Sequence, residues 1–375
     1  MKNIIEFLKC NAERNPSKLF CEDSNNKYDY GESYRIVSSI ASYLYEQGIA
    51  NSPILFRAER DCSSLLTMLG IIMSNNYYVP INSEFSLEKE ESVIESSNIK
   101  YEIVFDDKRN NNLTSFNYNE IIKNDFNENI YELLSSSFDE NNNMYTIYTS
   151  GSTGKPKGVL KTQKNIISFV NNFIETFKFD NGLNIANQAP LFFDASMKDI
   201  YLALATCSTI YFPEKSLFAM PAKLIEYLNE KKINYICWVP SALSIIVRLK
   251  TFNFIKPEYL KYVLFVGEVF MPKYLNMWLK ELPNITYVNL YGSSEIAGVC
   301  LYKIIDNLLD EDKPIALGKP LANNKVYLDD GEIIVESEQI ASCYVNDEEK
   351  NKVVFSNIGG TRILRTGDYA FINDT

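Results

Sequence analysis

An unbroken run of small, hydroxylated and basic residues, Tyr148–Gly158, carries the strongest chemical signal in the sequence. It consists of Tyr-Thr-Ser-Gly-Ser-Thr-Gly-Lys-Pro-Lys-Gly. Glycines let a backbone turn its N–H groups toward an anion, and the three hydroxyl groups between positions 150 and 153 add hydrogen-bond donors. Lys155 and Lys157 add positive charge. This combination of groups predicts a loop that holds a polyphosphate.

The run is not a Walker A loop, because Lys155 is followed by Pro156 where that motif needs serine or threonine. A flexible surface loop of small polar residues is the simplest alternative, since most Gly/Ser loops are that. Two features favour phosphate binding: every position of the run suits an anion, and the β-prone stretch Met144–Tyr148 leads directly into it.

Three further segments combine groups that suit a nucleotide or a small charged substrate. Asn289–Glu295 contains two serine hydroxyls and a carboxylate, which fit a phosphate and a hard cation bound to it. Arg365–Asp368 and Phe193–Ser196 each place an aspartate in a short polar segment. Each segment is weak alone, because Gly-Asp turns and strands that end in polar turns are common.

Together and in this order, the segments resemble the AMP-forming adenylating superfamily, which includes acyl-CoA synthetases, luciferases and the adenylation domains of nonribosomal peptide synthetases. The resemblance extends over nearly the whole chain and implies ATP and Mg²⁺ as reactants. In that reaction a substrate carboxylate attacks the α-phosphate of ATP and pyrophosphate leaves. The nucleophile is already an anion and needs no protein base, so a sequence without histidine can perform it.

The resemblance assigns nucleotide roles residue by residue. Asn289 is expected at the adenine edge, Tyr291 on the adenine face, and Asp368 at both ribose hydroxyls. Ser294 stands where relatives usually have threonine and keeps the hydroxyl for a phosphate, while Glu295 is the expected Mg²⁺ ligand. The expected catalytic residues are Thr149, Ser150, Lys157, Ser294 and Glu295; the expected nucleotide-binding residues are Ser152, Thr153, Gly154, Gly267, Asn289, Leu290, Tyr291, Gly292 and Asp368.

Asp194 is the residue that narrows the substrate class. In amino-acid-activating members of the superfamily, an aspartate in this segment pairs with the α-ammonium group, whereas aryl- and fatty-acid-activating members generally lack it. The remaining pocket is small and mostly apolar, which predicts a small amino acid. The expected substrate-binding residues are Phe193, Asp194, Ala195, Lys198, Trp238, Leu264, Val266, Leu290, Gly298 and Val299.

Lys198 is the unusual member of this pocket, and the sequence leaves three roles open for it. A buried ammonium group needs an anion, so Lys198 could meet a carboxylate on the substrate side chain. On a helix it could instead form an i,i+4 pair with Asp194. It could also point to solvent.

Periodic patterns predict the elements that position these residues. Thr162 is a predicted N-cap for a helix with apolar residues at helical spacing, and short apolar strands alternate with helices from about 183 to 300. Asp330-Gly331 between two short apolar runs predicts a hairpin. We therefore expect an α/β fold: two layered α/β subdomains with largely parallel sheets over about 1–300, and a β-rich subdomain over about 301–375. Residues 107–143, rich in asparagine and acids, are expected to be an insertion or a surface hairpin.

Composition excludes several function classes. The net charge of −11 disfavours binding to nucleic acid or to an anionic membrane surface, and the absence of histidine excludes Ser–His hydrolysis and His-ligated zinc. Seven cysteines without a CxxC motif suit a reducing compartment. Glu6 interrupts any signal-peptide core, and no apolar run approaches the length of a membrane span. We expect a cytoplasmic protein.

Superfamily members usually continue beyond Asp368 into a mobile C-terminal domain with a second catalytic lysine. The sequence ends at Thr375, so we expect it to be the N-terminal core, 1–375, to bind ATP and substrate, and to adenylate slowly. The leading expectation is an amino-acid adenylation domain that loads a carrier protein with a phosphopantetheine arm. The alternatives are an acyl- or aryl-acid CoA ligase and a nucleotide-binding module without full catalysis.

Overall fold

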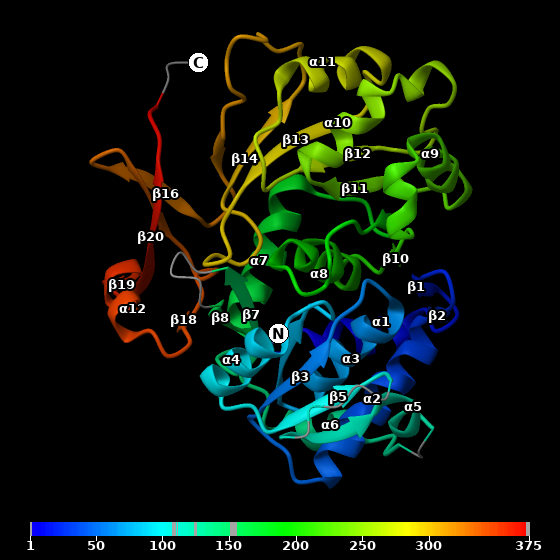
Figure 1. The fold of residues 1–375 in the computed structure, drawn as a ribbon, viewed down its shortest axis with the longest axis vertical. Helices are drawn as coiled ribbons and strands as arrows, with labels where there is room; N and C mark the ends of the chain where they lie inside the picture. The colour runs from blue at the N-terminus through cyan, green and yellow to red at the C-terminus, as the bar shows by residue number, and fades with distance from the viewer. Residues whose placement is uncertain (1, 107–109, 111, 124–125, 151–155, 373–375) are drawn as a thin grey trace.

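The computed structural model describes residues 2–106, 110, 112–123, 126–150 and 156–372. They form two α/β layers stacked on each other, with a smaller β unit beside them near the C-terminus (Figure 1). The expected fold class is confirmed: two of the three sheets are largely parallel, and the third is small and antiparallel.

The lower layer in Figure 1 is a seven-stranded sheet in the order β18-β8-β7-β4-β3-β5-β6. The strands from β7 to β6 in this order run parallel, β8 pairs antiparallel with β7, and β18 pairs antiparallel with β8. The strand bounds are β3 Pro53–Arg57, β4 Tyr77–Ile81, β5 Tyr101–Val104, β6 Thr114–Asn117, β7 Asn143–Ser150, β8 Pro156–Thr162 and β18 Cys343–Tyr344. The helices of this layer are α2 Tyr30–Glu46, α3 Cys62–Met73, α4 Leu87–Ser97, α5 Tyr118–Ile121 and α6 Ile130–Ser135.

The upper layer is a nine-stranded sheet in the order β15-β14-β13-β12-β11-β9-β10-β1-β2. Its six central strands are parallel and the outer strands antiparallel. The strand bounds are β1 Leu19–Glu22, β2 Lys27–Asp29, β9 Asn184–Ala186, β10 Thr209–Tyr211, β11 Tyr235–Trp238, β12 Tyr262–Phe265, β13 Thr286–Tyr291, β14 Leu301–Ile305 and β15 Lys319–Pro320. The α-helices are α1 Ile5–Arg14, α7 Gln163–Phe177, α8 Met197–Ala205, α9 Pro221–Glu230, α10 Pro240–Arg248 and α11 Pro272–Glu281; the 3-10 helices are η1 Asp194–Ser196, η2 Lys215–Ala219 and η3 Thr251–Asn253.

The small antiparallel sheet has the order β16-β17-β20-β19 and carries one short helix. Its bounds are β16 Lys325–Asp329, β17 Glu332–Glu336, α12 Glu348–Val354, β19 Phe355–Ile358 and β20 Thr361–Tyr369. The predicted hairpin at Asp330-Gly331 is confirmed, and both residues have positive φ, 48° and 83°, as a type I′ turn requires.

Local sequence signals explain how α7 starts beside the site. Thr162 caps the helix as predicted: its hydroxyl accepts from the Asn165 backbone, and the Asn165 side chain accepts from the Thr162 backbone. The apolar face of α7, with Ile166, Phe169 and Phe173, packs into the core between the two layers. This fixes the path of β8, which ends where α7 begins.

Two predictions about the fold differ from the structure. Residues 107–143 are not a hairpin where they are described: β6 is a parallel edge strand, and α5 and α6 bury Ile121 and Ile130. Asparagine side chains there form hydrogen bonds with the backbone, as Asn117 does when it caps α5. A polar composition in this segment is therefore compatible with regular helices and strands. The small sheet begins at Lys325 rather than near 301, because β14 and β15 extend the nine-stranded sheet.

The largest apolar core lies between the two layers and is shared by α2, α3, α7 and α8. A second core under α9, α10 and α11 covers the opposite face of the nine-stranded sheet. Across the first core, the hydroxyls of Tyr78 in β4 and Tyr201 in α8 lie 2.8 Å apart and join the layers. Among the described residues, no helix is long and apolar enough to cross a membrane.

Candidate active site

Strand β8 presents two lysines on one face toward the junction of the layers. Lys157 and Lys161 are four residues apart, and side chains of a strand alternate between its faces, so both point the same way. Lys157 reaches Glu295, with Nζ 3.0 Å from Oε1. Lys161 reaches Asp194, with Nζ 2.6 Å from Oδ1. One strand thus connects the predicted metal ligand and the predicted substrate ligand.

Glu295 is held as a carboxylate at the open end of this arrangement. Besides Lys157, it accepts a 2.7 Å hydrogen bond from the Tyr344 hydroxyl. Burial acts to raise the pKa of Glu295, but the hydrogen bonds from Tyr344 and Lys157 and the charge of Lys157 outweigh it and lower the pKa below its usual value. The Lys157 ammonium also lies over the Tyr344 ring, 3.4 Å from its centroid.

The donor set around Glu295 fits a Mg²⁺ ion that arrives with phosphates. Mg²⁺ is commonly held by one or two carboxylates together with substrate phosphate oxygens and water. Glu295 is such a carboxylate, and its lowered pKa keeps it charged. Within the described part of the chain, no cluster of three or more metal-ligating side chains forms a complete protein cage.

Part of the predicted phosphate loop lies outside the described residues. The residues outside the described part are Ser152, Thr153 and Gly154, together with the side chain of Ser150. The two ends of the loop are described: Thr149 in β7 pairs with Lys157 in β8, and the Thr149 hydroxyl lies 3.5 Å from the Lys157 carbonyl oxygen. Ser294 is half-buried in the turn next to Glu295.

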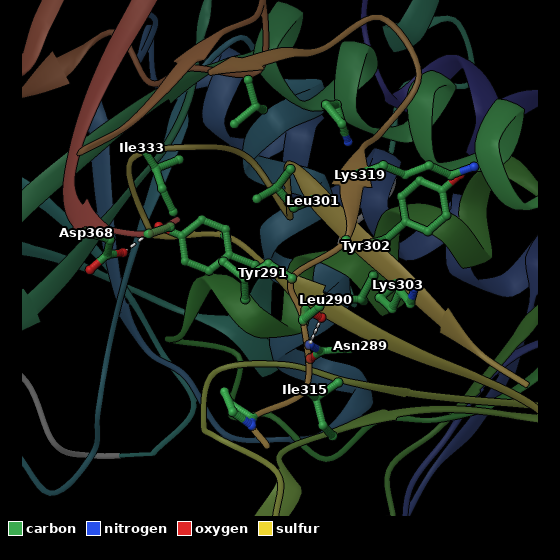
Figure 2. A pocket seen from close by; sticks show the side chains of 18 of the residues that line it. Asn289, Leu290, Tyr291, Leu301, Tyr302, Lys303, Ile315, Lys319, Ile333 and Asp368 are labelled. Carbon is green, nitrogen blue, oxygen red and sulfur yellow. Dashed lines mark hydrogen bonds between the residues drawn. The ribbon is translucent and has the colours of Figure 1, made fainter. Parts of the chain in front are cut away.

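A cavity of about 1270 Å³ lies beside this point, between the nine-stranded sheet and the small sheet. Its lining includes Gly267 and the run Asn289–Gly292 on one side and Asp368 on the other (Figure 2). The predicted nucleotide residues outside the phosphate loop are therefore brought together. Parallel strands β12 and β13 end here, which is where open α/β sheets bind ligands.

Tyr291 and Asp368 face each other across the cavity, and the Tyr291 hydroxyl donates to Asp368 at 2.5 Å (Figure 2). Burial and the adjacent Asp368 carboxylate raise the pKa of Tyr291, so it stays neutral. Asn289 donates to the Ala316 carbonyl oxygen at 3.0 Å. Gly267 has a φ of +91°, a conformation that other residues rarely adopt, so glycine is needed for the turn after β12.

The acceptor side of the site is built around Asp194, at the start of η1. Its Oδ1 accepts from Lys161 and also from the Tyr145 hydroxyl at 2.7 Å. Tyr145 lies opposite Lys161 in the β7–β8 pairing. Lys161 also donates to the Ile296 carbonyl oxygen at 3.4 Å, which ties the acceptor side to the turn that carries Glu295.

Five predicted pocket residues lie together on the core side of the nine-stranded sheet. Leu264, Val266, Leu290 and Val299 share one apolar cluster. Gly298 is buried against Phe169, which leaves no room there for a Cβ atom. Ala195 is half-buried in η1, whereas Phe193 is 48% exposed and its ring packs at a tilt against that of Phe192.

Trp238 is a wrong assignment. It lies on the other face of the sheet, in the second core, where its indole N–H donates to the Ala186 carbonyl oxygen at 2.8 Å. Its neighbour Cys237 faces the pocket side together with Leu264. Because strand side chains alternate, an error of one position moves a residue to the opposite face.

Two of the three roles considered for Lys198 are also wrong. The side chain is buried, with 2% exposure, so it does not point to solvent. Its ammonium donates to the Ala195 carbonyl oxygen at 2.8 Å, while the ion pair of Asp194 is made by Lys161. The sequence reasoning missed Lys161, Tyr145 and Tyr344; only the even spacing of Lys161 from Lys157 along β8 could have indicated the first.

Comparisons with known proteins place the chain among adenylating enzymes. The profile of the family described as AMP-binding enzyme matches residues 8–345. The D-alanine--D-alanyl carrier protein ligase of Staphylococcus epidermidis is 26% identical over 377 residues, covering 100% of this chain and 76% of that protein. The ligase of the same description from Listeria monocytogenes is 27% identical, covering 99% of this chain and 77% of that protein.

Solved structures share the fold. The N-terminal subdomain of Klebsiella oxytoca NpsA, in complex with 3-hydroxybenzoyl-AMSN, has a TM-score of 0.86 at 18% identity, covering 100% of this chain and 98% of that chain. The nonribosomal peptide synthetase FmoA3 in its AMPPNP-bound form has a TM-score of 0.87 at 20% identity; the match covers 98% of this chain and 41% of that chain.

Proposed function

The chain belongs to the AMP-binding enzyme family, and on that basis we propose that it activates an amino acid as aminoacyl-AMP for loading onto the phosphopantetheine thiol of a carrier protein. Relatives over its whole length are carrier protein ligases. The observation that carries the proposal is the buried Asp194 carboxylate, which Lys161 links to the turn bearing Glu295. A substrate amino group at Asp194 then has its own carboxylate near the nucleotide.

In the proposed first step, a substrate carboxylate oxygen forms a bond to the α-phosphorus of ATP, and the bond from that phosphorus to the bridging oxygen of pyrophosphate breaks. Lys157 supplies positive charge to the phosphates once ATP displaces it from Glu295. Glu295 would hold a Mg²⁺ ion, which would supply further positive charge to the phosphates. Asp368 and Tyr291 separate from each other to receive the ribose and the adenine.

In the proposed second step, the carrier thiol releases its proton to water, its sulfur bonds to the acyl carbon, and AMP leaves with the electrons of the acyl–oxygen bond. The chain contributes no histidine to this step. Positioning of two reactants in one site provides the main acceleration.

The alternative, activation of an acid without an amino group, is favoured by one observation: Lys161 already pairs with Asp194. Pyrophosphate exchange with amino acids of both enantiomers and their deamino analogues separates the two functions. We expect an amino acid to exceed its deamino analogue by about tenfold or more, the effect of one charged hydrogen bond. Equal exchange with both, or faster exchange with the deamino acid, would contradict the proposal.

A further inference from the structure

The acceptor pocket contains a buried ammonium group with which no carboxylate of the described residues forms an ion pair. Lys198 is 2% exposed, and its ammonium donates to a neutral acceptor, the Ala195 carbonyl oxygen at 2.8 Å. Burying a charge is costly unless an opposite charge balances it. The partner of Lys198 must therefore come either from a neighbouring residue or from the substrate.

Asp194, one helical turn before Lys198, is not available as that partner. Its Oδ1 already accepts from Lys161 at 2.6 Å and from Tyr145 at 2.7 Å. The Lys161 side chain is 1% exposed and that of Asp194 10%, so this is a fixed internal pair. Among the described residues no donor is placed on Oδ2, which leaves that oxygen for the amino group of a substrate.

The other groups around Lys198 balance its charge only in part. Burial raises the pKa of Asp199 to about 7, although Lys198 acts against the shift, and its Oδ2 accepts from Asn187 at 2.9 Å. Burial raises the pKa of Cys237 to about 12, so this thiol is neutral. Glu295 is engaged by Lys157 and Tyr344. The pocket therefore sets two buried lysines, Lys161 and Lys198, against the paired carboxylate of Asp194 and the buried carboxyl of Asp199.

On the sheet side, the described residues of the pocket are mainly apolar. Leu264, Leu290 and Val299 belong to the apolar cluster on this face of the sheet. A neutral side chain would leave the Lys198 charge as it is. A side chain that carries a carboxylate would neutralise it and form a charge-assisted hydrogen bond.

We infer that the pocket selects an amino acid with a carboxylate in its side chain, with Lys198 as the counter-ion of that carboxylate and Lys161 as the residue that keeps Asp194 from taking this role. The inference rests on the proposed function and names its substrate class. Lys198 is a specificity-determining residue here, and Lys161 is a positioning residue that acts through Asp194.

The test measures binding of stable sulfamoyl-adenosine analogues of four aminoacyl adenylates to the 375-residue chain by calorimetry. The glutamyl and glutaminyl analogues form one isosteric pair, the aspartyl and asparaginyl analogues another, and both enantiomers are used. We expect the acidic analogue of one pair to bind about tenfold or more tightly than its amide. Lys198→Met should abolish this ratio, and Lys198→Arg should keep part of it.

Lys161→Met provides a second readout that a purely structural role would not produce. With Lys161 gone, Asp194 can pair with Lys198, so the preference for the acidic analogue should fall although Lys198 is unchanged. The matched control is Lys164→Met, which removes a lysine in the first turn of α7 that pairs with Glu338 at the surface, and it should keep the wild-type ratio. Far-ultraviolet circular dichroism checks that each variant is folded.

The outcomes separate the inference from the proposed function. If the wild-type chain binds amide analogues as tightly as acidic ones, or prefers a neutral amino acid in pyrophosphate exchange, the inference is wrong while amino-acid activation stands. If only deamino acids support exchange, the proposed function itself fails. The wild-type ratio needs no variant, so it decides the inference even if Lys161→Met does not fold.

Discussion

The two lysines of β8 make the same kind of ion pair in opposite surroundings. The Lys157 and Glu295 side chains are 21% and 19% exposed, whereas those of Lys161 and Asp194 are 1% and 10% exposed in the core. A pair that solvent partly reaches is worth less than a fully buried one and exchanges partners at smaller cost. A buried pair is expensive to separate. The first pair is thus suited to be opened by an incoming nucleotide, and the second sets a fixed charge in the substrate pocket.

Removing one partner of each pair should show the largest difference between them. Asp194→Asn leaves the Lys161 ammonium buried without an anion and should lower the free energy of unfolding by about 3 kcal/mol. Glu295→Gln should lower it by less than about 1 kcal/mol. Urea unfolding of both variants measures the contrast, and the double variant Lys161→Met/Asp194→Asn should recover most of the loss. Equal costs for the two single variants would contradict the distinction.

In the buried acceptor pocket, Asp199 makes the free energy of unfolding depend on pH. The pKa of Asp199 is about 7 in the folded chain, against 3.8 in its reference state. Between these values the unfolded chain releases a proton that the folded chain keeps, so folding loses stability as pH rises from about 4 to about 7. The full penalty, roughly 2–4 kcal/mol, applies above pH 7.

Asp199→Asn should remove this slope. Melting curves of the wild type and the variant at pH 5 and pH 7.5 measure it, with the variant gaining stability relative to the wild type at the higher pH. A constant difference between the two proteins across this range would show that Asp199 ionises normally.

On the nucleotide side, the main expected effect is on catalysis. Glu295→Gln keeps the size of the side chain but removes the charge proposed for Mg²⁺, and it should reduce pyrophosphate exchange about 100-fold. Its KM for MgATP should rise while the KM for the amino acid stays near the wild-type value. Asp194→Asn should instead raise the KM for the amino acid and leave the KM for MgATP near the wild-type value. If both variants change the two KM values alike, the site is not divided into a nucleotide side and an acceptor side.

The smallest expected effect belongs to Tyr344, which the structure adds to the nucleotide side. Tyr344→Phe removes the 2.7 Å hydrogen bond to Glu295 but keeps the ring beneath Lys157. We expect the KM for MgATP to rise about tenfold, as for the loss of one hydrogen bond to a charged group. Tyr45→Phe, on the exposed side of α2 and outside the lining of the nucleotide cavity, serves as the control and should change nothing measurable.

The predictions that succeeded came from residues whose role is local in the chain. Thr162 was placed at the start of α7 and Asp330-Gly331 in a turn because caps and turns depend on adjacent residues. The assignment of Trp238 to the pocket is wrong because a shift of one position along a strand moves a side chain to the opposite face of the sheet. The hairpin expected in the asparagine-rich segment is wrong because composition alone does not show that a side chain such as Asn117 caps a helix.

The sequence by itself determined the family and the groups available for chemistry: the phosphate loop, Glu295, Asp368 and Asp194. It could not determine which charges meet. Lys157 and Glu295 are 138 residues apart in the chain, and Lys161 and Asp194 are 33 apart. Only the packing of β8 against η1 and the turn after β13 brings them within bonding distance. An ion pair depends on distance in space and on burial, and neither is written in the spacing of the motifs.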